Sequence, residues 1–322
     1  MSNSIQIPDN FTISHAADRI KNYINKTPVL TNSSINKIFD TSIFFKCENF
    51  QKVGAFKFRG ATNAVFSLNE SELEFGVATH SSGNHAQALA LAAKNRGIKA
   101  NIVMPEDSSK VKIAAVKEYG GNIIFCKPTL AAREETLKKV IEETNSIEIH
   151  PYDNYRIIAG QATAAKELIE EIDNLDIIIA PVGGGGLLSG TALANHYFSP
   201  KTKVYAAEPI NANDAFLSFY SKKFIPSINP QTIADGLRTS LGDFTFPIML
   251  QHVHEIYTCS EQKIIEAMKL VWERMKIIIE PSSAVALAIL FENNIDIKGK
   301  RIGIIISGGN VDLMDLPWMN KK

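Results

Sequence analysis

Short β-branched runs alternate with amphipathic stretches along most of this chain. The amphipathic stretches place apolar residues at helical spacing, as in His85–Arg96 and Leu130–Thr144. This alternation is typical of parallel sheets wrapped by helices. Further predicted helices are Lys110–Tyr119 and Ile157–Glu171, and the predicted strands are Val77–His80, Ala100–Met104, Asn122–Cys126, Ile177–Val182, Val204–Ala207, Ile256–Cys259 and Arg301–Ile306. We therefore expect an α/β protein with two open, mostly parallel, twisted sheets flanked by helices.

Three strand–helix units follow one another between Gly76 and His150. A set of this size is enough for a small open-sheet domain. We therefore expect a small mobile domain at 76–150 and a larger domain made from 1–75 and 151–322. The polar stretch Ser221–Gln231, which holds two prolines, is expected to be a surface excursion.

Composition narrows the function classes. Apolar residues make up 45% of the chain and charged residues 21%, which is typical of a globular protein. Lys and Arg balance Asp and Glu at 34 each, so nothing indicates a nucleic-acid or anionic-membrane partner. Met1–Asn10 lacks the order of a secretion signal, no apolar run reaches membrane-spanning length, and the three cysteines are far apart. We expect a cytoplasmic protein with reduced thiols in its core.

A run of four glycines stands between a predicted strand and a predicted helix. Gly183, Gly184, Gly185 and Gly186 follow Ile177–Val182 directly. Strand, glycines and helix together offer bare backbone N–H groups and a helix N-terminus to a phosphate. A tight turn without a ligand is the alternative.

The phosphate could belong to a dinucleotide, since Glu208 ends the next strand, where a ribose-binding acid would stand. However, a G-x-G pattern that starts at Gly184 places Ser189 at the third glycine position. A nucleotide-binding oxidoreductase is therefore the weaker alternative.

One lysine is a candidate nucleophile. Lys57 lies between Phe56 and Phe58 in a segment bounded by Gly54 and Gly60. Burial disfavours the ammonium form and lowers the pKa of a lysine, and a neutral amine can form a Schiff base with an aldehyde such as pyridoxal phosphate. The alternative is an ordinary surface lysine whose aliphatic stem passes two aromatic rings.

These features recur with others in a specific order. The sequence resembles the fold-type II pyridoxal-phosphate (PLP) enzymes, the tryptophan synthase β-like family, and within it the branch of serine racemases and serine/threonine dehydratases. The resemblance covers nearly the whole chain. The segments that carry it are Thr27–Leu30, Phe45–Lys52, Gly54–Gly60, Ser81–Gln87, Ala159–Gln161, Gly183–Gly186 and Ser307–Asn310.

The resemblance implies a PLP site. Lys57 would be the Schiff-base lysine and Phe56 would pack against the ring. Asn84 would hydrogen-bond the phenolic oxygen, and the glycine loop with Leu187 would hold the phosphate. Ser307 would face the pyridine nitrogen and Glu280 would lie near the ring. A neutral serine partner leaves the ring a weaker electron sink, which favours loss of a β-hydroxyl or rapid reprotonation over transamination.

The same resemblance implies the substrate and the reaction. A serine racemase interconverts L- and D-serine and also eliminates water from serine to give pyruvate and ammonia. Ser82 would be the acid/base on the face opposite Lys57, unless it only binds carboxylate. The alternatives are a serine/threonine dehydratase without racemase activity and a catalytically silent binding relative. Threonine would be a further substrate, and a homodimer is implied. The substrate-binding set would be Ser81, Ser82, Gly83, Asn84, His85, Arg133 and Gly236.

A cation site is predicted directly after the strand Val204–Ala207. Glu208 and Asp214 lie six positions apart around a turn, and carboxylate and carbonyl oxygens suit a hard cation. The resemblance implies that Glu208, the Ala212 carbonyl and Asp214 bind Mg²⁺, or Ca²⁺ or Mn²⁺. The alternative is a helix start with Asn211 or Asn213 as its cap.

The resemblance also implies ATP as an activator at a subunit interface. Val53 and Asn32 stand where the mammalian type carries hydroxyl side chains, which counts against nucleotide contacts. The matching positions are Asn32, Ser33, Ser34, Lys52, Gln87, Tyr119, Lys276 and Asn310.

Overall fold

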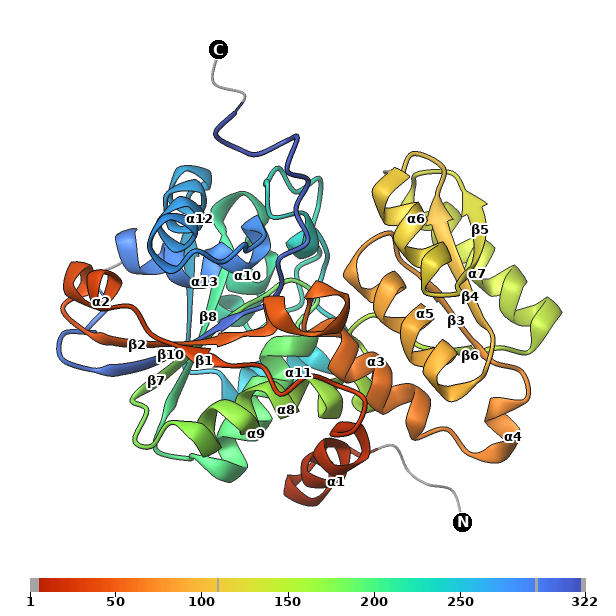
Figure 1. Ribbon diagram of the computed structural model, residues 1–322, viewed down its shortest axis with the longest axis horizontal. Coiled ribbons are helices and arrows are strands. Elements are labelled where there is room, and N and C mark those ends of the chain that lie inside the picture. Colours follow the sequence, from red (N-terminus) through yellow and green to blue (C-terminus); the bar gives the residue numbers. More distant parts are fainter. Residues whose placement is uncertain (1–5, 109, 293–294, 320–322) are drawn as a thin grey trace.

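The computed structural model describes residues 6–108, 110–292 and 295–319. It consists of two lobes, each built around its own sheet (Figure 1). The larger sheet has the order β1-β2-β10-β7-β8-β9, and only β1 runs antiparallel to its neighbour. Its strands are β1 (Val29–Leu30), β2 (Ser42–Cys47), β7 (Ile177–Pro181), β8 (Lys203–Pro209), β9 (Glu255–Cys259) and β10 (Arg301–Ile306).

The smaller sheet is wholly parallel and draws its strands from one continuous stretch of chain. Its order is β5-β4-β3-β6. The strands are β3 (Val77–His80), β4 (Ala100–Pro105), β5 (Asn122–Cys126) and β6 (Ile147–Glu148). Two mostly parallel sheets flanked by helices confirm the expected fold class.

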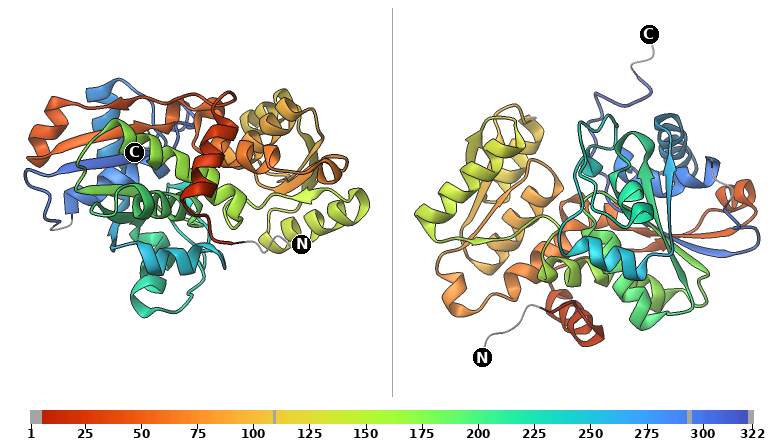
Figure 2. Two further views of the ribbon diagram at one scale, coloured as in Figure 1. Left: turned by 90° about the horizontal axis from the view of Figure 1, so that it is seen from below. Right: turned by 180° about the vertical axis from the view of Figure 1, so that it is seen from behind.

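Helices cover both sheets (Figure 2). Around the small sheet lie α4 (Glu70–Leu73), α5 (Asn84–Arg96), α6 (Lys110–Glu118) and α7 (Leu130–Thr144). The other helices are α1 (Asn10–Ile20), α2 (Ser33–Phe39), α3 (Lys57–Phe66), α8 (Tyr155–Glu171), α9 (Gly186–Phe198), α10 (Asp214–Ser221), α11 (Thr245–His252), α12 (Glu261–Met275) and α13 (Pro281–Glu292). Four 3₁₀ turns are also described: η1 (Glu48–Phe50), η2 (Lys52–Gly54), η3 (Ile210–Ala212) and η4 (Asp235–Leu237).

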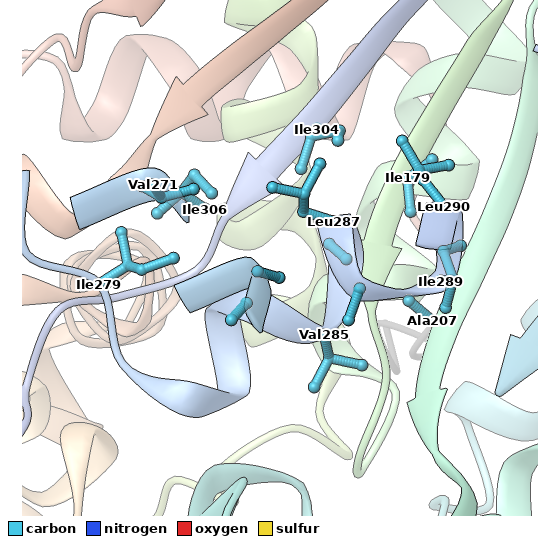
Figure 3. Close-up of a cluster of buried hydrophobic side chains, with 14 of the residues drawn as sticks. Ile179, Ala207, Val271, Ile279, Val285, Leu287, Ile289, Leu290, Ile304 and Ile306 are labelled. Atoms are coloured by element: carbon cyan, nitrogen blue, oxygen red, sulfur yellow. The ribbon is translucent and has the colours of Figure 1, made fainter. Parts of the chain in front are cut away.

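Helix α13 is the centre of the larger core. Residues 281–290 are all buried, so this helix is apolar on every side, as expected for a helix enclosed by other layers. Leu287 and Ile289 pack with Ile179 of β7 and Ile304 of β10 (Figure 3). The central strands are buried on both faces, which explains their uninterrupted apolar runs.

The carboxyl ends of the strands converge on the space between the lobes. In open α/β sheets, ligands bind at this edge. β7 leads into the glycine loop, β10 into Ser307, and β3 into Ser81. Helix α3 packs against both α5 and α8 and so joins the two lobes. Side chains from distant parts of the sequence therefore meet here.

Two other expectations concern the chain as a whole. Cys47, Cys126 and Cys259 are free and buried, as expected of core thiols. Within the described ranges, no helix has the length and apolar character needed to cross a membrane.

Candidate active site

A cavity of about 700 Å³ lies between the lobes. It brings together every residue predicted to bind cofactor or substrate, from segments more than 200 positions apart. The predicted residues in its lining are Phe56, Lys57, Ser81, Ser82, Gly83, Asn84, His85, Arg133, Gly183, Gly184, Gly185, Gly186, Leu187, Gly236, Glu280 and Ser307.

Lys57 begins α3 at the wall of this cavity. Its Nζ donates a hydrogen bond of 2.7 Å to the carbonyl oxygen of Pro151 and lies 5.3 Å from the ring centre of Phe56. Burial lowers the pKa of Lys57 to about 8, although the Glu280 carboxylate acts in the opposite direction. An amine with this pKa is neutral in roughly a tenth of molecules at pH 7, which is sufficient for a nucleophile.

The glycine loop is shaped so that only glycine fits. Gly185 has φ +88°, in the left-handed region. A Cβ at Gly184 would lie 2.4 Å from the ring of Tyr152, and one at Gly183 would lie 2.9 Å from the Cα of Leu237. The loop therefore keeps its backbone N–H groups bare beside the first turn of α9, which is the arrangement that holds a phosphate.

Glu280 is a buried carboxylate at the cavity wall. Its two oxygens accept hydrogen bonds of 3.1 and 3.2 Å from Asn84 Nδ2, and Oε2 also accepts one of 3.2 Å from Asn310 N. Burial and the charge of Asp235 raise the pKa of Glu280 to about 7. Asn310 Nδ2 in turn donates to Asn84 Oδ1 at 2.8 Å, so these three side chains hold one another in place.

Ser307 follows β10 and is almost wholly buried. Its Oγ lies 2.9 Å from Ser283 Oγ. Ser283 donates its hydroxyl proton to Gly308 O at 2.6 Å and accepts a hydrogen bond from Gly308 N at 2.7 Å. Because the Ser283 proton is already used, the Ser307 hydroxyl is the one that can donate either to Ser283 Oγ or to a ring nitrogen in the cavity.

The segment after β3 forms the opposite wall. Gly83 is the N-cap of α5, so the first N–H groups of that helix point toward the cavity and suit a carboxylate. The buried His85 ring lies 3.1 Å from Ile149 O through Nε2, which gives the neutral ring a proton on Nε2. Burial, more than the nearby Lys57 charge, lowers the pKa of His85 well below its usual value.

Charged side chains line the cavity mouth. Arg133 of α7 makes a long hydrogen bond of 3.5 Å to Thr129 O. Lys112 of α6 forms an ion pair of 3.0 Å with Asp235, which belongs to the other lobe. Gly236 N donates to Ser282 Oγ at 3.0 Å. The mouth is therefore crossed by one ion pair, with a guanidinium beside it.

The lining also contains residues that the sequence did not predict, among them His150, Tyr152 and Thr239. Tyr152 packs on the glycine loop and its hydroxyl lies 2.9 Å from Thr239 Oγ1. His150 Nδ1 accepts hydrogen bonds from the Tyr152 and Asp153 N–H groups, and burial lowers its pKa to about 4. Isolated His and Tyr residues give no pattern in a sequence, and the strand that precedes them, β6, has only two residues, so no sequence signal marks them.

The stretch Ser221–Gln231 is the predicted surface excursion and also reaches the cavity. It lies at the surface, yet Ser227, Asn229 and Pro230 line the cavity. Its polar, proline-containing composition predicts a loop correctly and carries no sign that the loop reaches the site.

The predicted cation ligands lie away from this cavity, where β8 ends. The carboxylate of Glu208 accepts hydrogen bonds from Ala215 N (2.9 Å) and Phe216 N (2.8 Å), so it caps α10. Asn213 stands at the cap position but makes no side-chain cap bond. Both carboxylate oxygens of Asp214 are buried without a hydrogen bond of normal geometry. The helix start that the alternative named is therefore present, with Asn213 at the cap position, but the Glu208 carboxylate and not an Asn side chain accepts from the first turn.

Without a cation, the charged forms of the Glu208 and Asp214 carboxylates are unfavourable where they lie. Burial and the charge of Asp214 raise the pKa of Glu208 well above its usual value. Burial raises the pKa of Asp214 to about 6, against a weaker lowering effect of Ser227. Across the described ranges, no group of three or more His, Cys, Asp or Glu side chains is placed to ligate a metal, so a cation here would need carbonyl oxygens or water.

The eight positions matched to an ATP site are not gathered in the main cavity. Asn310 lines it, and the other seven lie outside its lining. Asn32 caps α2 and donates to Arg274 O, while Lys52 and Lys276 donate to the Tyr23 and Glu273 carbonyls. Gln87 is buried in α5. Ser33 and Ser34 begin α2, and Tyr119 is half-buried after α6.

The cavity fits pyridoxal phosphate. A glycine cradle that no Cβ could share faces a buried lysine with a lowered pKa, and a neutral serine hydroxyl is at hand for a ring nitrogen. The family model for pyridoxal-phosphate dependent enzymes matches residues 20–308. This chain belongs to that family.

Relatives within the PLP family are similar over almost their full lengths. The chain is 53% identical to a serine racemase of Dictyostelium discoideum, over 94% of this chain and 95% of the relative. It is 50% identical to a β-hydroxyaspartate dehydratase of Paracoccus denitrificans, over 94% and 96%. The structure of maize serine racemase superposes with a TM-score of 0.93 at 43% identity, over 96% of this chain and 95% of that one.

Proposed function

We propose that this chain is a PLP-dependent serine racemase that also eliminates water from serine. The observation that carries the proposal is that the buried Lys57 and the glycine cradle line the same cavity. Serine racemases similar over nearly the whole chain support the substrate. Elimination gives pyruvate and ammonia, because the β-hydroxyl is a leaving group beside the Cα from which the proton is removed.

The residues would divide the work as follows. When bound, the cofactor holds the amino group of the substrate and stabilises negative charge at Cα. The N–H groups of the glycine loop hold its phosphate, and Ser307 faces its nitrogen without charging it. Lys57 Nζ removes and returns the Cα proton on one face, and Ser82 Oγ does so on the other. The first turn of α5 binds the substrate carboxylate.

Two variants test these roles. Lys57→Ala removes the amine, so the visible absorbance of the bound cofactor and all turnover should disappear. Ser82→Ala removes only the second proton carrier, so racemisation should fall far more than L-serine elimination. Chiral analysis of L-serine incubations measures both activities. Pyruvate without D-serine in the wild-type enzyme would assign a dehydratase instead.

A dehydratase for a hydroxylated dicarboxylic amino acid is a second candidate. Arg133 lines the cavity, and its one hydrogen bond among the described residues is a long one, so its guanidinium can pair with a second substrate carboxylate. The relative named β-hydroxyaspartate dehydratase supports it. Arg133→Gln should then lower kcat/KM for 3-hydroxyaspartate far more than for serine. Equal losses for both substrates would reject this candidate.

A divalent cation is proposed at Glu208, the Ala212 carbonyl and Asp214. Burial raises the pKa of both carboxyl groups, and the charge of Asp214 raises that of Glu208 further, so a positive ion would stabilise both carboxylates. Oxygen ligands favour Mg²⁺, Ca²⁺ or Mn²⁺. Mg²⁺ should raise the thermal unfolding temperature of wild-type protein. No rise on addition of Mg²⁺, Ca²⁺ or Mn²⁺ would remove the site.

Mobility, assembly and activation remain predictions from the resemblance. The Lys112–Asp235 ion pair joins the lobes, which suits closure of the segment 76–150 over the substrate. A homodimer, a cytoplasmic location and activation by ATP are expected on the same basis. ATP titration of the holoenzyme, read as elimination rate, tests the last. If ATP leaves the elimination rate unchanged at saturating Mg²⁺, the prediction of activation by ATP is rejected.

A further inference from the structure

Two helices that begin at the glycine loop end together at a second cavity. Helix α9 starts with Gly186, the last glycine of the loop, and α11 starts with Thr245, whose Oγ1 donates to Gly184 O at 2.9 Å. The two helices pack against each other. Their carboxyl-terminal turns border a cavity of about 280 Å³ and carry His196 and His252 into its lining.

The two imidazoles lie against each other at the cavity wall. Their ring centres lie 4.6 Å apart, with the ring planes at 51°. In the part of the chain that the structure describes, neither ring makes a hydrogen bond, whereas His254, the third histidine of the cavity, does. Burial, followed by the charge of His196, lowers the pKa of His252, which keeps its ring neutral and a nitrogen lone pair available.

The spacing of the rings fits a shared metal ion. For a tetrahedral ion with metal–nitrogen bonds of about 2.0–2.1 Å, two ligating imidazole centres lie about 5 Å apart, because each centre is about 1.1 Å behind its nitrogen. The observed separation of 4.6 Å between the two ring centres is close to this value, and a small rotation of either side chain makes up the difference. The negative ends of two helix dipoles also meet at this cavity and favour a cation.

His254 is excluded as a ligand by its tautomer. Its Nδ1 accepts a hydrogen bond of 3.1 Å from Val204 N, so the neutral ring carries its proton on Nε2. The remaining coordination positions fall to water or to the side-chain oxygen of Gln251, which also lines the cavity. The ligand pair is therefore one imidazole from each helix end.

We propose that His196 and His252 bind one divalent transition-metal ion, of the zinc and copper class, at the joined carboxyl ends of α9 and α11. Imidazole nitrogens select such ions over Mg²⁺ and Ca²⁺, so the site is chemically distinct from the carboxylate pair at Glu208. An ion held there ties together the far ends of the two helices whose near ends form the glycine cradle. It binds the folded chain only and stabilises it.

The test is a titration of the holoenzyme with Zn²⁺ and, for spectroscopy, Cu²⁺. Saturating Mg²⁺ is present throughout, so that hard oxygen sites are filled. The variants are His196→Gln and His252→Gln, with His254→Asn as the matched control, since asparagine can keep an acceptor near Val204 N. We expect the wild type and the control to bind one ion that each of the other variants binds at least tenfold more weakly. Equal affinity in all four proteins would overturn the proposal.

A second measurement needs no variant. Diethylpyrocarbonate modifies accessible histidines, and mass spectrometry locates the modified residues. Zn²⁺ should protect His196 and His252 and leave the exposed His15 and His254 reactive. It should also raise the unfolding temperature of the wild type and not of His196→Gln. Equal modification of His196 with and without Zn²⁺ would contradict the site even if the variants proved unstable.

Discussion

Replacement of Glu280 by glutamine isolates the effect of one buried charge on stability. Burial, followed by the charge of Asp235, raises the pKa of this carboxyl group from 4.5 to about 7. The folded state therefore prefers the protonated form, and the unfolded state releases the proton at a lower pH. For such a group, stability is fully present below the unfolded pKa and is lost as pH rises toward the folded pKa.

The size of the loss follows from the two pKa values. Between pH 5 and pH 8, a group that titrates near 4.5 when unfolded and near 7 when folded removes about 2.5 kcal/mol from the free energy of unfolding. Glutamine does not titrate in this range. The variant also alters hydrogen bonds with Asn84 and Asn310, but that change is the same at both pH values and cancels in the comparison.

Urea unfolding of the cofactor-free protein at pH 5 and pH 8 measures the difference. We expect the wild type to lose about 2–3 kcal/mol more than Glu280→Gln between the two pH values. Glu134→Gln is the control, because Glu134 lines the same cavity but is exposed. It should follow the wild type. A pH dependence shared by wild type and Glu280→Gln would refute the argument that burial holds this carboxyl group protonated.

Three further predictions concern the rest of the molecule. Gly184→Ala should weaken cofactor binding at least tenfold in an absorbance titration, because its Cβ would lie 2.4 Å from the Tyr152 ring, and Gly184→Ala with Tyr152→Ala should recover part of the loss. Asp214→Asn should abolish the Mg²⁺-dependent rise in unfolding temperature. Without Mg²⁺ it should stabilise the protein at pH 8 relative to wild type, because the raised pKa of Asp214 costs stability as pH climbs from 3.8 through about 6. Arg59→Met should lower the free energy of unfolding by about 3–5 kcal/mol in urea titrations, since it leaves Glu48 buried without its partner.

Apolar periodicity predicts many of the longer elements of this fold, although α12 and α13 are not among them, and it predicts the shortest strands poorly. Val77–His80, Asn122–Cys126 and Arg301–Ile306 are strands with the predicted bounds, and Leu130–Thr144 is the predicted helix. Strands β1 and β6 have two residues each, which is too few for any period to show. Strand β2 was missed because Lys46 interrupts its apolar run.

Some residues of the candidate site can likewise be predicted from local sequence patterns, and others cannot. Lys57, the glycine loop and the segment at Ser81 each lie in a contiguous pattern whose chemistry is legible in the sequence. Tyr152 and Thr239 become neighbours only because β7, α11 and the chain after β6 converge on the glycine loop. Periodicity within one element carries no information about such an encounter.

A buried ion network near Lys57 explains how strand β2 can carry the charged Lys46 although it lies inside the sheet, between β1 and β10. Lys46 of β2 and Arg59 of α3 are fully buried and share the carboxylate of Glu167 at 2.6 and 2.7 Å. Glu48 takes the opposite side of the Arg59 guanidinium at 2.7 Å, so two cations meet two anions. Removal of any one of these four side chains leaves another charge buried without a partner, so the four depend on one another.

That unit fixes the start of α3. Arg59 lies two residues after Lys57, in the first turn of the same helix. Its guanidinium pairs with Glu48 of η1 and with Glu167 of α8. Glu167 in turn pairs with Lys46 of β2. A bidentate guanidinium–carboxylate pair sets both distance and direction. The charges of the large lobe therefore fix the backbone turn from which the Lys57 side chain extends, and the Pro151 carbonyl holds the amine itself.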